Sequence, residues 1–168
     1  CPMLRKFTWC VKTFSPETLP MPFDTFQQLT SLTLEAATLH PYFGFPLGLV
    51  ELGLKVSDQP FDLNHLTKLA RLQMLDLDVD RATAPLDLSN CASLKTLLAH
   101  DSPITRFPPS LVECSVSLGI ASDLSHLTRL TLMGLLLRSC VGVIFPTQLR
   151  RLTFVGCLRS SNLEEVQL

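Results

Sequence analysis

The stretch Leu94–Ile104 reads L-K-T-L-L-A-H-D-S-P-I and carries the spacing that decides the fold. The apolar residues that set this spacing stand at offsets 0, 3, 5 and 10, at Leu94, Leu97, Ala99 and Ile104. Similar spacings recur along almost the whole chain, and they begin at Leu4, Leu29, Leu49, Leu72, Leu94, Leu111, Leu127, Leu149 and Leu163. Since one such segment cannot bury its own apolar side, the repetition predicts short strands that stack into a solenoid.

Two kinds of connector lead into these segments. The first, F-P-x-x-L, places a phenylalanine four residues before the leucine that opens a segment, at Phe45, Phe107 and Phe145. Because proline fixes φ and lacks an N–H, the chain should enter the strand extended, with the phenylalanine filling the core. The second connector, D-L-[NS], begins at Asp62, Asp87 and Asp123. Its aspartate is expected to cap a short turn or the start of a helix.

These residues and their spacing resemble the leucine-rich-repeat family over roughly residues 4 to 168. The resemblance implies an α/β fold: a solenoid with a parallel sheet on its concave face, forming one domain over residues 1–168. The Phe-Pro connectors predict a convex side made mostly of loops, 3₁₀ turns or short helices. A parallel β-helix and a compact α/β domain are the rival folds. Because the chain begins at Cys1 rather than Met, we expect it to be a fragment of a longer protein.

Two features depart from the family pattern. The distances from Leu94 to Leu111 and from Leu111 to Leu127 fall below the family's usual length of roughly 20–29 residues. Offset 8, where the family usually carries asparagine, holds Lys12, Ala37, Ser57, Asp80, Ser102, Gly119, Leu135 and Cys157. We therefore expect irregular turns after the strands, in which buried backbone groups find other hydrogen-bond partners.

The composition narrows the possible functions. Hydrophobic residues make up 46% of the chain and charged residues 17%, and the net charge of −1 argues against nucleic acid as a partner. No apolar run approaches the roughly 18 residues of a membrane helix. The six cysteines form no C-x-x-C pair, and Cys114 and Cys157 fall on core offsets, so buried free thiols are expected. Together with the absence of an N-x-S/T sequon, this favours an intracellular, cytoplasmic protein.

No pattern in the sequence indicates catalysis. There is no G-x-S-x-G nucleophile motif and no phosphate-binding glycine loop, so we expect neither an enzyme nor a cofactor. Cys114 and Cys157 are interpreted as core thiols, and Asp76 and Asp78 as the solvated side of a strand rather than an acid–base pair. His65 and His126 stand at equivalent connector positions, and we expect surface residues there rather than a metal site.

The strand residues at offsets 2, 4 and 6 point away from the core, and on these the sequence places a candidate binding surface. Its members on the concave face are Glu35, Glu51, Lys55, Asp76, Asp78, Leu98, His100, Glu113, Arg129, Met133 and Arg151. The middle of this surface is mainly acidic and its C-terminal part basic, with Leu98 and Met133 as apolar contacts. The pattern favours a non-catalytic scaffold or protein–protein interaction module, either monomeric or associating end to end. The alternative is a substrate-recognition segment of a larger enzyme or ubiquitin-ligase assembly.

Overall fold

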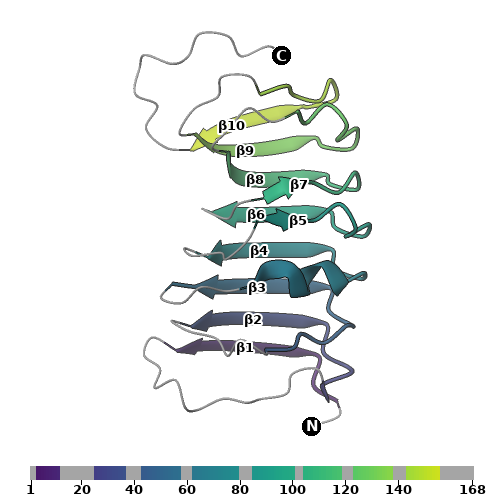
Figure 1. The fold of residues 1–168 in the computed structure, drawn as a ribbon, viewed down its shortest axis with the longest axis vertical. Coiled ribbons are helices and arrows are strands. Elements are labelled where there is room, and N and C mark those ends of the chain that lie inside the picture. Colours follow the sequence, from purple (N-terminus) through teal and green to yellow (C-terminus); the bar gives the residue numbers. More distant parts are fainter. Residues whose placement is uncertain are drawn as a thin grey trace.

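The computed structural model describes residues 3–11, 25–36, 43–57, 62–79, 85–100, 104–118, 123–137 and 143–155. Eight parallel strands form one sheet in the order β1-β2-β3-β4-β6-β8-β9-β10 (Figure 1). These strands are β1 (Lys6–Val11), β2 (Ser31–Ala36), β3 (Glu51–Val56), β4 (Met74–Val79), β6 (Thr96–His100), β8 (Glu113–Leu118), β9 (Leu132–Leu137) and β10 (Arg151–Val155). The predicted solenoid of stacked parallel strands is therefore confirmed.

One face of this sheet is buried. Along β4, Leu75, Leu77 and Val79 are fully buried, and the side chains between them are not. Residues at equivalent positions pair across the sheet, so that Leu52 lies beside Leu75 and Leu75 beside Leu97. The repetition in the sequence thus becomes continuous apolar rows that run along the solenoid.

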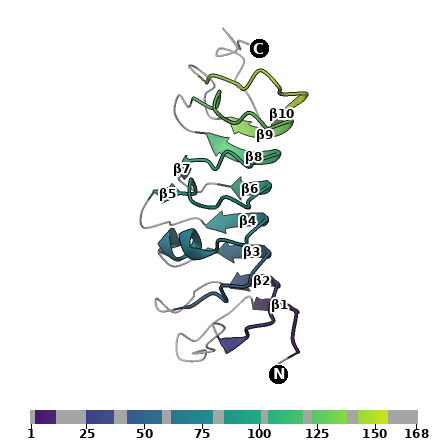
Figure 2. The same cartoon turned by 90° about the vertical axis from the view of Figure 1, so that its right-hand side faces the viewer.

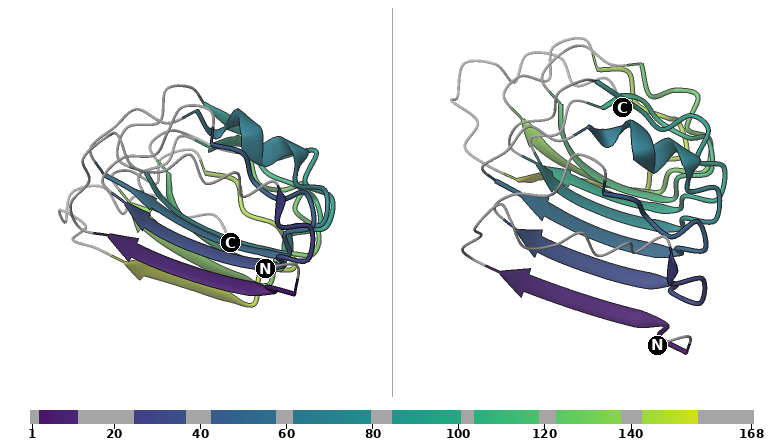
Figure 3. Two further views of the ribbon diagram at one scale, coloured as in Figure 1. Left: turned by 90° about the horizontal axis from the view of Figure 1, so that it is seen from below. Right: turned by 60° about the horizontal axis from the view of Figure 1, so that its bottom comes forward.

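The connectors cover the buried face of the sheet (Figure 2). They include the 3₁₀ helix η2 (Leu63–Lys68) and a second, two-stranded parallel sheet of β5 (Leu86–Asp87) and β7 (Ile104–Arg106). Seen along the stack, η2 lies across the core from the main sheet (Figure 3), and β5 and β7 lie on the same side as η2 (Figure 2). Among the described residues η2 is the one helix whose bounds are given, and this scarcity of helix agrees with the expectation of connectors built mostly from loops and 3₁₀ structure.

The leucines of the η2 connector are spaced three apart. Leu63, Leu66, Leu69 and Leu72 are all buried. A 3₁₀ helix has three residues per turn, so this spacing puts the side chains one above another on a single side. The turns then continue to the strand, since the N–H of Leu69 donates to the carbonyl of Leu66 and that of Leu72 to Leu69.

The predicted aspartate caps are confirmed at all three Asp-Leu connectors. The Oδ1 atoms of Asp62, Asp87 and Asp123 each accept a hydrogen bond of 2.9 Å from the backbone N–H two residues later. The Phe-Pro connectors also repeat one geometry. In each, the N–H of the leucine two residues before the strand donates to the proline carbonyl, and the phenylalanine is buried; these are Phe45, Phe107 and Phe145.

The predicted register is wrong at β9. Met133 pairs with Cys114 of β8 and with Leu152 of β10, so Met133 occupies the core position that was predicted for Leu130. The repeat therefore opens at Leu130 rather than at Leu127. The distances from Leu111 to Leu130 and from Leu130 to Leu149 are then 19 residues each, which evens out the spacing but leaves both repeats just below the family's usual length of roughly 20–29 residues.

Several predictions lie wholly or mostly outside the described residues. These are the turns that follow the strands, the last repeat from Leu163 to Leu168, and the burial of Cys157. Family membership in the leucine-rich repeats stays a prediction. Among the residues that the structure describes, no helix combines the length and hydrophobicity needed to span a bilayer.

Candidate functional site

The face of the main sheet that points away from the core, called here the open face, carries the candidate site. Its side chains alternate with the buried ones, so each parallel pairing aligns them in rows. One row across β2, β3, β4 and β6 contains Thr33, Gly53, Asp76 and Leu98. The next row contains Glu35, Lys55, Asp78 and His100. The parallel register thus brings together side chains from four separate repeats.

These two rows line a groove of about 350 Å³, called here the open-face groove. Its floor is formed where Gly53 lacks a side chain. A Cβ atom at Gly53 would lie 3.2 Å from Cγ2 of Thr33, closer than the two side chains would normally pack. The neighbouring positions in the same row, Thr33 and Asp76, carry side chains. The absence of a side chain at Gly53 therefore leaves a hollow between them.

The groove carries more negative than positive charge. Glu35, Asp76 and Asp78 contribute carboxylates, against the ammonium group of Lys55. Lys55 Nζ lies 3.2 Å from Asp78 Oδ2, with 54% and 36% of the two side chains exposed. An ion pair this exposed contributes little to stability, because solvent screens it. On the side of β1, Cys10 Sγ donates to Glu35 Oε2 at 3.0 Å.

Six of the residues predicted from sequence line this groove, namely Glu35, Lys55, Asp76, Asp78, Leu98 and His100. Three further predicted residues lie on the open face outside the groove lining. Glu51 opens β3, Glu113 opens β8 and Arg151 opens β10, and all three are exposed.

Two of the predicted residues are placed wrongly, and both errors follow from the register at β9. Met133 is only 3% exposed and belongs to the core, so it offers no apolar contact to a partner. Arg129 lies in the turn before β9 rather than on the strand, although it is exposed. The open-face positions of β9 belong instead to Leu132 and Gly134, which are partly exposed.

Thr33 and Gly53 line the groove but were not among the predicted site residues. The signal for them was present in the sequence. A glycine at offset 4, where the adjacent repeats carry Thr33 and Asp76, marks a missing side chain in an otherwise continuous row.

Two of the three described cysteines are unsuited to nucleophilic chemistry; the third, Cys10, is exposed, against the expectation of buried thiols. Cys91 and Cys114 are buried, which confirms the prediction for Cys114. Burial raises the pKa of the Cys114 thiol to about 12 and also raises the pKa of Cys91. Since the thiolate is the reactive form, both groups stay protonated and inert near neutral pH. Within the described ranges, no three His, Cys, Asp or Glu side chains gather closely enough to hold a metal ion.

No family model matches this sequence, and comparisons with curated proteins and with solved structures gave no match. The functional assignment therefore rests on the geometry of the open face.

Proposed function

We propose that this chain is a non-catalytic interaction module that binds another protein in the open-face groove, on what would be the concave side of a leucine-rich-repeat solenoid. The groove itself carries the proposal, since it gathers outward side chains from four repeats around a hollow at Gly53. Stacked repeats offer extended surfaces of this kind to protein partners.

The charge of the groove indicates the chemistry of the partner. Three carboxylates against one ammonium group favour a segment that carries lysine or arginine. Leu98, beside Asp76 in the same row, supplies an apolar contact within the charged surface. Because the carboxylates are partly exposed, they should mainly set the association rate and the choice of partner.

The test is affinity capture with the wild-type chain and an Asp76→Lys/Asp78→Lys variant, after circular dichroism shows that both fold. The expected result is a partner that the wild type retains and the groove variant loses. A Glu51→Lys/Glu113→Lys variant is the matched control, because it makes the same charge change on the same face outside the groove. It should retain the partner.

Equal loss in both variants would show a general charge effect instead of a site in the groove. Retention by the groove variant would move the binding site elsewhere. A captured partner should also dissociate more readily as salt rises, because screening weakens contacts between exposed charges. The alternative predicted from the sequence, a recognition segment of a larger enzyme, would require the same binding step.

A further inference from the structure

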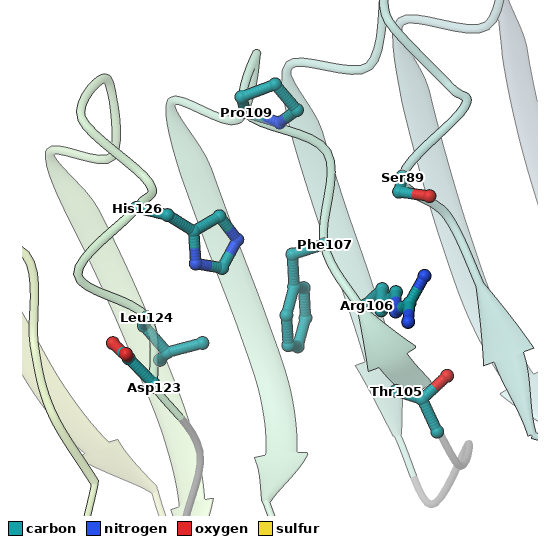
Figure 4. A pocket seen from close by; sticks show the side chains of 8 residues that line it. All are labelled: Ser89, Thr105, Arg106, Phe107, Pro109, Asp123, Leu124 and His126. Carbon is teal, nitrogen blue, oxygen red and sulfur yellow. The ribbon is translucent and has the colours of Figure 1, made fainter.

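A second and larger pocket, of about 610 Å³, lies among the connectors, across the core from the open-face groove. We call it the connector pocket. It is lined by Ser89, Thr105, Arg106, Phe107, Pro109, Asp123, Leu124 and His126 (Figure 4). None of these residues belongs to the function proposed above.

The pocket forms because the connectors of adjacent repeats join in separate pairs through parallel β bridges. β5 pairs with β7, and the N–H of Leu88 extends this contact by donating to the carbonyl of Arg106. One repeat further on, Asp123 pairs with Ile144 in the same parallel manner. Between these two pairs, no backbone hydrogen bond joins the described residues 104–109 to 123–126. The gap between the two paired connectors is the pocket.

The middle of the connector pocket is apolar. Phe107 and Leu124 are buried and contribute to the core, and the exposed Pro109 continues the apolar lining. Figure 4 shows the ring of His126 beside Phe107. Flat aromatic groups bind well in such surroundings.

The two sides of the pocket carry opposite charges. Arg106 lies with Ser89 and Thr105 on one side of Phe107, and Asp123 lies on the other (Figure 4). Arg106 Nη1 is 3.5 Å from Asp87 Oδ2, and 73% of the arginine side chain is exposed, so the guanidinium group can turn to a ligand at little cost. Asp87 does not depend on that contact, since its Oδ1 already accepts from the Ser89 N–H.

The carboxylate of Asp123 is held in place and stays ionised. Its Oδ1 accepts from the N–H of Ser125 at 2.9 Å, which fixes the side chain at the start of the turn. Hydrogen bonds from Ser125 hold the pKa of Asp123 below its ordinary value, with a smaller contribution from His126. The carboxylate is therefore ionised at neutral pH, and it lies at the edge of the pocket beside Leu124 (Figure 4).

We propose that the connector pocket binds a small molecule with a flat apolar body, an acidic group at one end and an amine at the other. The acidic group contacts Arg106, the body lies against Phe107 and Leu124, and the amine contacts Asp123. A volume of about 610 Å³ is within the range of small-molecule sites, roughly 300–1,000 Å³. The connector pocket thereby gives the chain a ligand site separate from its protein-binding face.

The test uses 4-(aminomethyl)benzoate as probe and follows backbone amide signals by NMR. A probe of this size should bind with a Kd on the order of 1 mM. The shifts should centre on the pocket residues Thr105, Phe107 and Leu124. Arg106→Gln and Asp123→Asn should each weaken binding about tenfold, as expected for loss of a charged contact. Asparagine keeps the turn, because its side-chain oxygen can also accept from Ser125.

Two further probes separate the two ends of the pocket. 4-Methylbenzoate lacks the amine, so only Arg106→Gln should weaken its binding. 4-Methylbenzylamine lacks the carboxylate, so only Asp123→Asn should do so. Arg71→Gln and Asp62→Asn are the matched controls, since they make the same changes at an exposed arginine and at an equivalent capped turn outside the pocket. Shifts centred elsewhere, no saturable binding, or equal loss in variants and controls would overturn the proposal.

Discussion

On β4, Leu75 and Leu77 are fully buried, whereas Asp76 and Asp78 line the open-face groove. The two sets alternate residue by residue along one strand, yet different requirements act on them. The buried set must pair with Leu52, Leu54, Leu97 and Ala99 in the adjacent strands. The outward set meets no such packing requirement, so its chemistry can vary without disturbing the stack.

The first prediction compares the effect of substitutions on these two faces. Leu75→Ala removes a side chain from a closely packed row in the middle of the solenoid, and should lower the free energy of unfolding by about 3–5 kcal/mol. Asp76→Ala, one residue later, should change it by less than about 0.5 kcal/mol. Urea denaturation of both variants and the wild type measures the difference. Similar losses from the two substitutions would contradict the division between the faces.

The second prediction tests the corrected register at β9. Met133→Ala should lower the free energy of unfolding by about 2 kcal/mol, toward the small end for a buried methionine because Met133 lies near the end of the sheet. Leu132→Ala, on the partly exposed open face, should lower it by less than about 1 kcal/mol. The register first predicted from the sequence requires the reverse order, so the same denaturation experiment decides between the two.

The strands were predictable because each repeat shows the same alternation of apolar and other residues within its own sequence. The aspartate caps were predictable for the same reason, since a cap depends on residues two positions apart. The register at β9 was not, because Leu127–Leu130–Leu132 and Leu130–Met133–Leu135 have the same spacing. The connector held the missing information: Asp87 precedes Leu94 by seven residues, and Asp123 precedes Leu130 by the same distance.

The two pockets could not be predicted from any single repeat. The open-face groove depends on which residue of β2 lies beside Gly53, and the pairing of the strands supplies Thr33. The charged residues of the groove were predictable because outward positions follow from alternation, whereas the shape of the groove was not. The connector pocket depends on which connectors pair with each other, as β5 does with β7. That pairing involves few residues and leaves no periodic pattern in the sequence.

The third prediction concerns the capping side chains of Asp87 and Asp123, which have a structural role at the connectors. Its expected effect is the smallest of the three. Hydrogen bonds from Ser89 hold the pKa of Asp87 below the ordinary value of 3.8, and those from Ser125 do the same for Asp123. A carboxyl group with a lowered pKa in the folded state stabilises the fold above its unfolded pKa. That stabilisation is lost as the pH falls from about 4 through the folded pKa, because protonation weakens the carboxylate as an acceptor.

An Asp87→Asn/Asp123→Asn variant keeps both turn acceptors but removes both titrations. The difference in stability between this variant and the wild type should therefore change with pH. When the pH is lowered from about 7 to about 3, the urea concentration at the unfolding midpoint should fall further for the wild type than for the variant. The difference should be small, since both carboxylates are well solvated. Asp76→Asn/Asp78→Asn serves as the control, because it makes the same two changes at aspartates of strand β4 rather than at the capped turns. If the turn variant and the wild type lost the same stability on acidification, the negative charge of the caps would contribute nothing to the fold, and the structural role of Asp87 and Asp123 would reduce to the hydrogen bonds that asparagine also accepts.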